Sequence, residues 1–357
     1  MRVTVLGAGA GGLAAAAVMS RQGLAVTLFS RSPVRLEPVA ARGGVEITGD
    51  RGEGFAPFDT TSDPARACDA DLLFLFTTAN AHADIARLLA PFVRPRHTVV
   101  VACGSAGSLE VATMWRQGGV DPLPLLGETA TLPQSARIIA PARVKIRLPS
   151  TVRTAAFPAT RTGELLERLD GIIRTRPGVN VLDTGLNNPN FIIHPVPMVL
   201  NYAAIERADG LLSIMNEGMT PGVLRAMDAH DAERMALAEA AGLEPISLDD
   251  LYREFGSSSA VYRQPGEPMG LRDRIHWRYI DEDVPYGSVF MSSLGRLLDV
   301  PTPINDALNW CASIARGVDY WASGRTVERL GLAGLDRETL PAYLQTGLRP
   351  AHVGRNA

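Results

Sequence analysis

Residues 2–12 read RVTVLGAGAGG, and the architecture of the first half of the chain follows from them. A short apolar run typical of a β-strand leads into Gly7, Gly9 and Gly12 in a G-x-G-x-x-G pattern, after which an Ala-rich helix is expected. The first glycine permits a tight turn, the second lets the backbone approach a pyrophosphate, and the third allows close packing. A strand before the glycines and a helix after them predict a dinucleotide site at the helix N-terminus.

The rest of the first half alternates short apolar runs with helix-like segments. Examples of the runs are LAVTLFS (24–30), DLLFLFTT (71–78) and HTVVVAC (97–103). Fully apolar short runs between helices indicate a parallel sheet covered on both faces. From Asn187 onward helix-period patterns dominate, among them 191–208, 223–241, 285–298 and 303–323. We therefore predict an α/β fold, with a Rossmann dinucleotide-binding domain at residues 1–185 followed by an all-α domain at residues 186–357. Within the latter, the polar stretch Gly256–Gly270 is predicted to be a surface loop.

The end of the second strand bears on the choice of dinucleotide. An NAD site usually places an acidic side chain there for the ribose hydroxyls, whereas an arginine suits the 2′-phosphate of NADP. Ser30 and Arg31 occupy this place, and Arg35 follows one helical turn later. The pattern favours NADP(H). If Arg31 only stacks on the adenine, NAD(H) is the alternative.

Composition excludes several classes of function. A net charge of −3 gives no general attraction to nucleic acid or to an anionic membrane. The longest apolar runs fall well short of the roughly 20 residues that span a bilayer. Met1 leads directly into a strand without a signal-peptide pattern, so a cytoplasmic location is expected. The cysteines Cys68, Cys103 and Cys311 are too scattered for a disulfide framework or a metal site, and we predict no metal.

A histidine in the second half is the strongest candidate for chemistry. His194 lies within NFIIHPVPMVLN (190–201), a segment predicted to form a helix that is apolar nearly all round. Burying an imidazole without a partner is costly, and an imidazole held by a carboxylate is a good general acid and base. Asp306 is the predicted partner. Asp283, in the run DEDVP, is interpreted as a helix N-cap instead.

The segment that contains Asp306 also shows a helical stripe. Within VPTPINDALNWCASIARG (300–317) and the next residue, apolar side chains recur at helical spacing and are predicted to face the core; they are Ile304, Ala307, Leu308, Cys311, Ile314, Ala315 and Val318. Trp310 shares a different face with Asp306. That face is predicted to border a cleft or a partner subunit.

Four segments in this order resemble the signature segments of the octopine/nopaline (opine) dehydrogenase family. They read GETATLPQSAR (127–137), NPNFIIHPVPMVLN (188–201), RYIDEDVPYGSV (278–289) and VPTPINDAL (300–308). With the N-terminal glycines they span almost the whole chain. The sequence departs from the family where LPQSAR replaces a tyrosine and small residues, and where YGSV has a serine in place of leucine, which affects the expected substrate more than the chemistry.

The resemblance implies an NAD(P)-dependent dehydrogenase acting on CH–NH bonds. Such an enzyme condenses the amine of an amino acid with a 2-oxo acid and reduces the imine, and no nucleic acid or membrane partner is expected. By family analogy His194 is the catalytic acid/base and Asp306 the aspartate that pairs with it. Arg137 and Arg278 are candidate anchors for the substrate carboxylates, because guanidinium binds carboxylate in bidentate fashion. Further candidate substrate residues are Glu128 and Glu282. The apolar helical domain favours a homodimer.

Two other functions stay open at this point. Hydroxyacid, ketopantoate and glycerol-phosphate reductases share the layout but generally carry a catalytic lysine on the helical domain. The chain has one lysine, Lys145, and it lies in the first domain, which argues against this class. A cofactor-binding sensor without chemistry is the third alternative.

Overall fold

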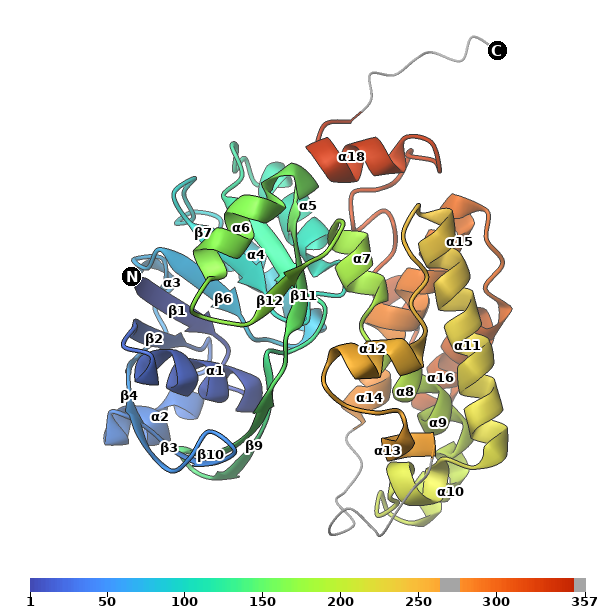
Figure 1. The fold of residues 1–357 in the computed structure, drawn as a ribbon, viewed down its shortest axis with the longest axis horizontal. Coiled ribbons are helices and arrows are strands. Elements are labelled where there is room, and N and C mark those ends of the chain that lie inside the picture. The colour runs from blue at the N-terminus through green and yellow to red at the C-terminus, as the bar shows by residue number, and fades with distance from the viewer. Residues whose placement is uncertain (264–276, 350–357) are drawn as a thin grey trace. The chain divides into compact units, whose positions relative to one another are not determined.

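The computed structural model describes residues 1–263 and 277–349 and is shown in Figure 1. The chain divides into two units. The first comprises Met1–Gly185 together with the described residues from Ala342 onward, and the second comprises Leu186–Pro341. Part of the predicted surface loop, residues 264–270, lies outside the described residues, whereas Ala260–Arg263 form helix α13.

The first unit is built on an eight-stranded sheet in the order β12-β11-β8-β7-β6-β1-β2-β5. Every neighbouring pair is parallel except β8 and β11. The strands are β1 (Arg2–Leu6), β2 (Ala25–Phe29), β5 (Asp59–Thr61), β6 (Leu72–Leu75), β7 (Thr98–Val101), β8 (Leu125–Thr129), β11 (Val152–Phe157) and β12 (Thr175–Pro177). The chain runs outward from β1 through β2 and returns to β6 on the other side, so the order reverses between β1 and β6. In such sheets a dinucleotide lies beyond the carboxyl ends of the strands at this point.

A smaller sheet covers helix α1 (Ala10–Arg21) from the other side. Its order is β4-β3-β10-β9, from Gly54–Pro57, Gly44–Gly49, Arg143–Pro149 and Gln134–Ala140 respectively. Helix α1 contacts strands of both sheets, and its buried run Ala14–Ala17 has side chains small enough for this close approach. The position of α1 fixes the glycine loop that precedes it.

The remaining helices of the first unit pack around these sheets (Figure 1). They are α2 (Pro33–Arg42), α3 (Pro64–Ala67), α4 (His82–Leu89), α5 (Gly107–Gln117), α6 (Thr162–Leu169) and α7 (Val181–Leu186), with short 3₁₀ turns at Ala79–Ala81 and Ala159–Arg161. The predicted α/β domain is confirmed.

Every regular element among the described residues of the second unit is a helix, as predicted. Its elements are α8 (Asn190–Ile193), α9 (Pro195–Leu200), α10 (Tyr202–Arg207), a π-helix η3 (Ile214–Gly218), α11 (Pro221–Ala240), α12 (Leu248–Glu254), α13, α14 (Arg278–Asp281), a π-helix η4 (Val284–Ser288), α15 (Val289–Leu298), α16 (Pro303–Arg316) and α17 (Tyr320–Ser323).

The prediction that the helical domain extends to residue 357 is wrong for the described residues from Ala342 onward. Helix α18 (Leu340–Thr346) brings this segment back to the first unit. There the ring of Tyr343 packs on Phe157 with centroids 5.4 Å apart, and its hydroxyl accepts a hydrogen bond from Arg116 at 3.1 Å. Aromatic contacts of this kind are non-local, and the sequence pattern does not reveal them.

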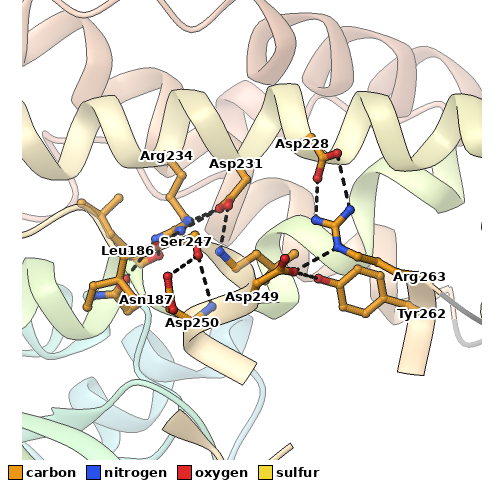
Figure 2. Close-up of polar contacts among 12 residues, drawn as sticks. Leu186, Asn187, Asp228, Asp231, Arg234, Ser247, Asp249, Asp250, Tyr262 and Arg263 are labelled. Atoms are coloured by element: carbon orange, nitrogen blue, oxygen red, sulfur yellow. Dashed lines mark hydrogen bonds and ion pairs between the residues drawn. The ribbon is translucent and has the colours of Figure 1, made fainter. Parts of the chain in front are cut away.

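A polar network holds the start of the second unit on α11 (Figure 2). Arg234 is fully buried, and it donates to Asp231 and to the Asn187 side chain at 2.8 and 3.0 Å. Nearer the N-terminus of α11, Arg263 bridges Asp228 and Asp249. A buried guanidinium is stable only when its donors are satisfied, so this network anchors the chain just before the His194 segment.

A second buried polar group in α11 is the imidazole of His230. His230 is fully buried; its Nε2 donates to the Asn305 side chain at 2.6 Å, while Nδ1 has no hydrogen-bond partner. Burial lowers the pKa of His230 to about 4. In the unfolded chain the pKa is about 6.5, so below that pH the unfolded state binds the proton first.

Stability is therefore expected to fall by about 3 kcal/mol from this residue as the pH drops from about 6.5 to about 4. The check is urea unfolding of the wild type and His230→Gln across this range. The glutamine can still donate to Asn305 but takes up no proton, so the variant should lose less stability in acid. Equal acid slopes in the two proteins would contradict the assignment.

Candidate functional site

The glycine loop of the first unit has the geometry of a nucleotide site. Gly7 has a φ of +128°, and a Cβ there would lie 2.4 Å from the carbonyl oxygen of Phe76, at the end of β6. A Cβ on Gly12 would lie 1.8 Å from the carbonyl oxygen of Gly7. Gly9, by contrast, has open space beside it and caps α1 without any side-chain hydrogen bond. A helix N-terminus without a side-chain cap, next to open space, suits a pyrophosphate.

The three side chains expected to select the dinucleotide lie at the end of β2 and the start of α2. Ser30 is 8% exposed, and its hydroxyl accepts a hydrogen bond from the backbone N–H of Ser32 at 3.2 Å. Arg31 is about half exposed and pairs with Asp84 of α4 at 3.4 Å. Arg35 is exposed on the first turn of α2. Two guanidinium groups at this strand end fit a phosphate better than a bare ribose.

In the second unit, His194 lies at a break in the predicted helix 191–208. The structure has three short helices here, and His194 separates α8 from α9. The next residues, Pro195 and Pro197, cannot donate backbone hydrogen bonds, so a continuous helix would be short of two. The His194 backbone still donates to Asn190 and accepts from Met198, both at 3.1 Å. The break thus leaves the imidazole on a firmly bonded backbone.

The imidazole of His194 is held by two neighbours. Its Nδ1 lies 2.8 Å from Oδ2 of Asp283, and the two side chains are 17% and 10% exposed. Its ring stacks on Tyr279, with centroids 3.9 Å apart and an interplanar angle of 15°. With Nδ1–H donated to the carboxylate, Nε2 is left to accept a proton. This is the arrangement of a general base oriented by a carboxylate.

A glycine allows the two segments to meet. Asp283 precedes the π-helix η4, and a Cβ on Gly287 would lie 2.2 Å from the ring of Phe191 in α8. Without a side chain at Gly287, the Phe191 ring packs directly on η4, three residues before His194. Single π-helical turns of this type are frequent at functional sites.

The predicted pairing of His194 with Asp306 is therefore wrong. Asp306 lies 3.9 Å from Arg296, and its side chain is 39% exposed. The interpretation of Asp283 as an N-cap is also wrong, because its side chain makes no capping hydrogen bond and bonds the imidazole instead. Sequence reasoning missed Asp283 and Tyr279. Both residues lie in RYIDEDVP (278–285), which is part of one of the four family-like segments, so the sequence did contain a signal for them.

Three consecutive carboxylates in this segment have three different partners. Asp281 pairs with Arg316 at 2.8 Å, Glu282 pairs with Arg278 at 3.5 Å, and Asp283 pairs with His194. Arg278 is 58% exposed and Glu282 20% exposed. These two predicted residues stand in the same stretch of sequence as Asp283, and the structure pairs them with each other.

The two candidates in the first unit differ from each other. Arg137 is exposed on β9 of the smaller sheet. Glu128 is fully buried at the end of β8 and accepts four hydrogen bonds, from the backbone of Ala106, from the backbone and hydroxyl of Ser108, and from the hydroxyl of Thr184. Burial raises the pKa of the Glu128 carboxyl above its usual value, against the effect of these bonds. The prediction that Glu128 binds substrate is corrected. Its carboxylate instead accepts hydrogen bonds from the segment after β7 and from α7.

Residues 1–263 and 277–349 hold neither a cluster of metal ligands nor a helix able to cross a membrane. Within these ranges, no three His, Cys, Asp or Glu side chains come together as a metal site would require. Nor does any helix there combine the length and hydropathy needed to cross a bilayer.

Comparisons with known proteins add to this geometry. Residues 177–315 match the family model of the α-helical domain of NAD/NADP octopine/nopaline dehydrogenases, and residues 3–119 match that of ketopantoate reductase PanE/ApbA. An opine dehydrogenase of Arthrobacter sp. (strain 1C) is 33% identical over 347 residues, which cover 93% of this chain and 95% of that protein.

Two solved structures are similar in fold. An octopine dehydrogenase with NADH and pyruvate gives a TM-score of 0.72 at 19% identity, with 99% of both chains covered. A yersinopine dehydrogenase with NADP⁺ bound gives 0.72 at 16% identity, with 97% of this chain and 98% of that chain covered.

Proposed function

Since this chain belongs to the octopine/nopaline (opine) dehydrogenase family of NAD(P)-dependent oxidoreductases, we propose that it joins an amino acid to a 2-oxo acid and reduces the resulting imine. The product is an N-(carboxyalkyl) amino acid, and the reaction falls among oxidoreductases of CH–NH bonds. The observation that supports this most strongly is the pair of His194 and Asp283, at 2.8 Å.

In the proposed mechanism, His194 acts twice. Nε2 first takes a proton from the ammonium group of the amino acid, and the free amine then attacks the keto carbon. A proton passes from the nitrogen to the oxygen of the adduct to give the carbinolamine. The imidazolium next gives its proton to the hydroxyl of the carbinolamine, which leaves as water and yields the imine in its protonated form, the iminium. Asp283 stabilises the imidazolium between these steps, and the Tyr279 ring fixes its plane.

Reduction of the imine requires the dinucleotide. NADPH, when bound, supplies the hydride to the imine carbon. On the protein side, Gly7, Gly9 and Gly12 would accommodate the pyrophosphate at the start of α1, and Arg31 with Arg35 would bind the 2′-phosphate.

The substrates carry carboxylates, which need cationic partners. We propose Arg278 as one anchor, because its guanidinium is exposed on the segment that holds Asp283, and Glu282 as a contact for the substrate amine. Arg137 is proposed as the second anchor on its charge and exposure. As partners we propose the amino acid, the 2-oxo acid and a second copy of the chain.

The cofactor part of the proposal predicts the effect of one substitution. Arg31→Ala should weaken NADPH binding by roughly 10- to 100-fold and leave NADH binding nearly unchanged, since a hydrogen bond to a charged group contributes about 1.5–3 kcal/mol. Arg87→Ala is the matched control, because Arg87 pairs with the same carboxylate of Asp84 at 2.6 Å. Dissociation constants for both dinucleotides, from fluorescence titration, provide the measurement. Equal losses for NADPH and NADH would contradict the assignment of Arg31.

The ketopantoate reductase class is the main alternative, because its family model matches residues 3–119. That match is confined to the first unit, and residues 186–357 contain no lysine. A screen of NADPH oxidation separates the two functions. Amino acids are crossed with pyruvate, glyoxylate and 2-oxoglutarate; we expect oxidation only when both substrates are present. Oxidation with a 2-oxo acid alone would favour the alternative.

A further inference from the structure

The first unit contains a cavity at the C-terminal end of α1. Its volume is about 500 Å³, a size typical of small-molecule sites. Three parts of the unit line it: the last turn of α1, the loops at the ends of strands in the smaller sheet, and the turn between α6 and β12. Every lining residue belongs to Met1–Gly185, so the cavity is complete without the second unit.

The cavity and the dinucleotide site lie at opposite ends of α1. The glycine loop precedes the first residue of this helix, whereas Val18, in its last turn, and Gln22, just after it, line the cavity. The 12 residues of α1 place its two ends about 18 Å apart. The cavity is therefore separate from the position that a pyrophosphate would occupy.

Hydrogen bonds to main-chain carbonyls hold the walls of the cavity in place. Gln22 donates from Nε2 to the carbonyl oxygens of Gly171 and Ile172, at 3.4 and 3.2 Å. The Ile172 side chain is buried in the core of the first unit. In another part of the lining, the Ser150 backbone donates to the carbonyl oxygen of Pro133 at 2.8 Å. The shape of the cavity thus follows from the fold and needs no ligand to form it.

Three charged side chains line the cavity and are still available to a ligand. They are Arg51, Asp170 and Arg174, and all three are exposed. No ion pair or side-chain hydrogen bond joins any of them to another residue in the described part of the chain. Two guanidinium groups and one carboxylate therefore face the same space, each with its hydrogen-bonding capacity open to a bound molecule.

We propose that this cavity binds an amino dicarboxylate, a small molecule with two carboxylates and one protonated amine. Each guanidinium can bind a carboxylate in bidentate fashion, and the Asp170 carboxylate can accept hydrogen bonds from the ammonium group. An inorganic anion would meet a like charge at Asp170, and a polyamine would meet like charges at both arginines. Only a ligand that carries both signs complements all three side chains.

Two sources can supply this chemistry. One is a free acidic amino acid such as glutamate. The other is the product of the proposed reaction, which has two carboxylates and a secondary amine. The second source rests on the proposed function, whereas the charges of the cavity do not. L-glutamate and N-(1-carboxyethyl)alanine are the probes for the two sources.

The test is calorimetric titration of the full chain, without dinucleotide, with L-glutamate and with glutarate, which lacks only the amine. We expect glutamate to bind about 10-fold more tightly than glutarate, because the ammonium adds charge-assisted hydrogen bonds to Asp170. Asp170→Asn should remove this preference, and Arg174→Ala should weaken both ligands by roughly 10-fold. Arg168→Ala is the matched control: Arg168 is exposed on α6 outside the lining, so its loss should change neither affinity.

Hydrogen exchange shows where the glutamate binds. Adding L-glutamate should slow exchange of the amides at residues 170–175 in the wild type and in Arg168→Ala, but not in Arg174→Ala. Slower exchange only around His194 would place glutamate in the candidate catalytic site and would overturn the proposal. Equal glutamate affinities in the wild type and Arg174→Ala, or no measurable binding to the wild type, would also overturn it.

Titration with N-(1-carboxyethyl)alanine distinguishes the two sources. Tighter binding than glutamate assigns the cavity to the reaction product, and weaker binding assigns it to a free amino acid; in either case Arg174→Ala should lose affinity. Opine synthesis is assayed in parallel. An enzyme that makes opines but binds neither probe in the cavity would refute this inference alone. An enzyme that binds glutamate as expected but makes no opine would refute the proposed reaction alone.

Discussion

His194→Asn is expected to lower kcat for opine synthesis by about 10²–10⁴-fold and to leave NADPH binding unchanged. The asparagine can place its amide N–H toward Asp283 as Nδ1 does now, so the buried carboxylate keeps a partner. What the variant lacks is a group that takes up and returns a proton. Both proton transfers of the proposed mechanism then fall to water.

The measurement is steady-state oxidation of NADPH with both substrates present, together with a fluorescence titration of NADPH. Since His194 belongs to the second unit and the glycine loop to the first, the two readouts report on separate parts of the chain. Undiminished turnover in His194→Asn would remove the imidazole from the mechanism. Loss of NADPH binding would point to a folding defect in place of a chemical one.

The second large effect is expected from Asp283→Asn, with Asp306→Asn as its matched control. The amide at position 283 has no charge to stabilise the imidazolium, and its N–H can force the imidazole into the wrong tautomer. We expect kcat to fall by roughly 10²–10⁴-fold. The same change at Asp306 should have little effect. The ion pair between Asp306 and Arg296, 3.9 Å apart, is largely in water and contributes at most about 1 kcal/mol.

Thermal unfolding separates chemistry from stability in this comparison. Asp283 is 10% exposed and Asp306 is 39% exposed, so a stability loss confined to Asp283→Asn must be measured before its kinetics are interpreted. A fall in kcat at a temperature where the variant is fully folded supports the pairing. The reverse ranking, with Asp306→Asn the slower enzyme, would restore the pairing that the sequence suggested.

The parts of the fold that the sequence predicted correctly rest on local signals. The turn at Gly7 and the packing of Gly12 on the Gly7 carbonyl depend on residues within one strand–helix unit. The apolar runs of the parallel sheet are likewise local, since the central strands β6, β7 and β8 are buried on both faces. His194 could be picked out because a histidine among apolar residues needs a reason to be there.

The partner of His194 could not be predicted in the same way. Asp283 lies 89 residues from it in the chain, and both Asp283 and Asp306 stand where a helix begins. An N-cap and a catalytic carboxylate look alike in a single sequence. The pairing depends on a contact between distant segments. Because Gly287 has no side chain, Phe191 packs against η4, next to Asp283 in the sequence.

Periodicity also failed for α16 for a physical reason. Of the stripe predicted to face the core, Leu308 is buried, whereas Ala307, Cys311, Ile314, Ala315 and Val318 are exposed. The inner face of α16 instead satisfies polar groups, with Asn305 bonded to His230 and Asn309 to Ser292. The prediction for Glu128 failed for a related reason. A buried carboxylate that accepts hydrogen bonds from Ala106 and Ser108 looks the same in the sequence as one that binds substrate.

The proposed reaction forms a new C–N bond before hydride is delivered. It is tested most directly by mass spectrometry of the product made from a ¹⁵N-labelled amino acid, a 2-oxo acid and NADPH. We expect one molecule that contains the carbon skeletons of both substrates and the ¹⁵N atom, in an amount equal to the NADPH oxidised. A 2-hydroxy acid without ¹⁵N, formed in that amount, would contradict it.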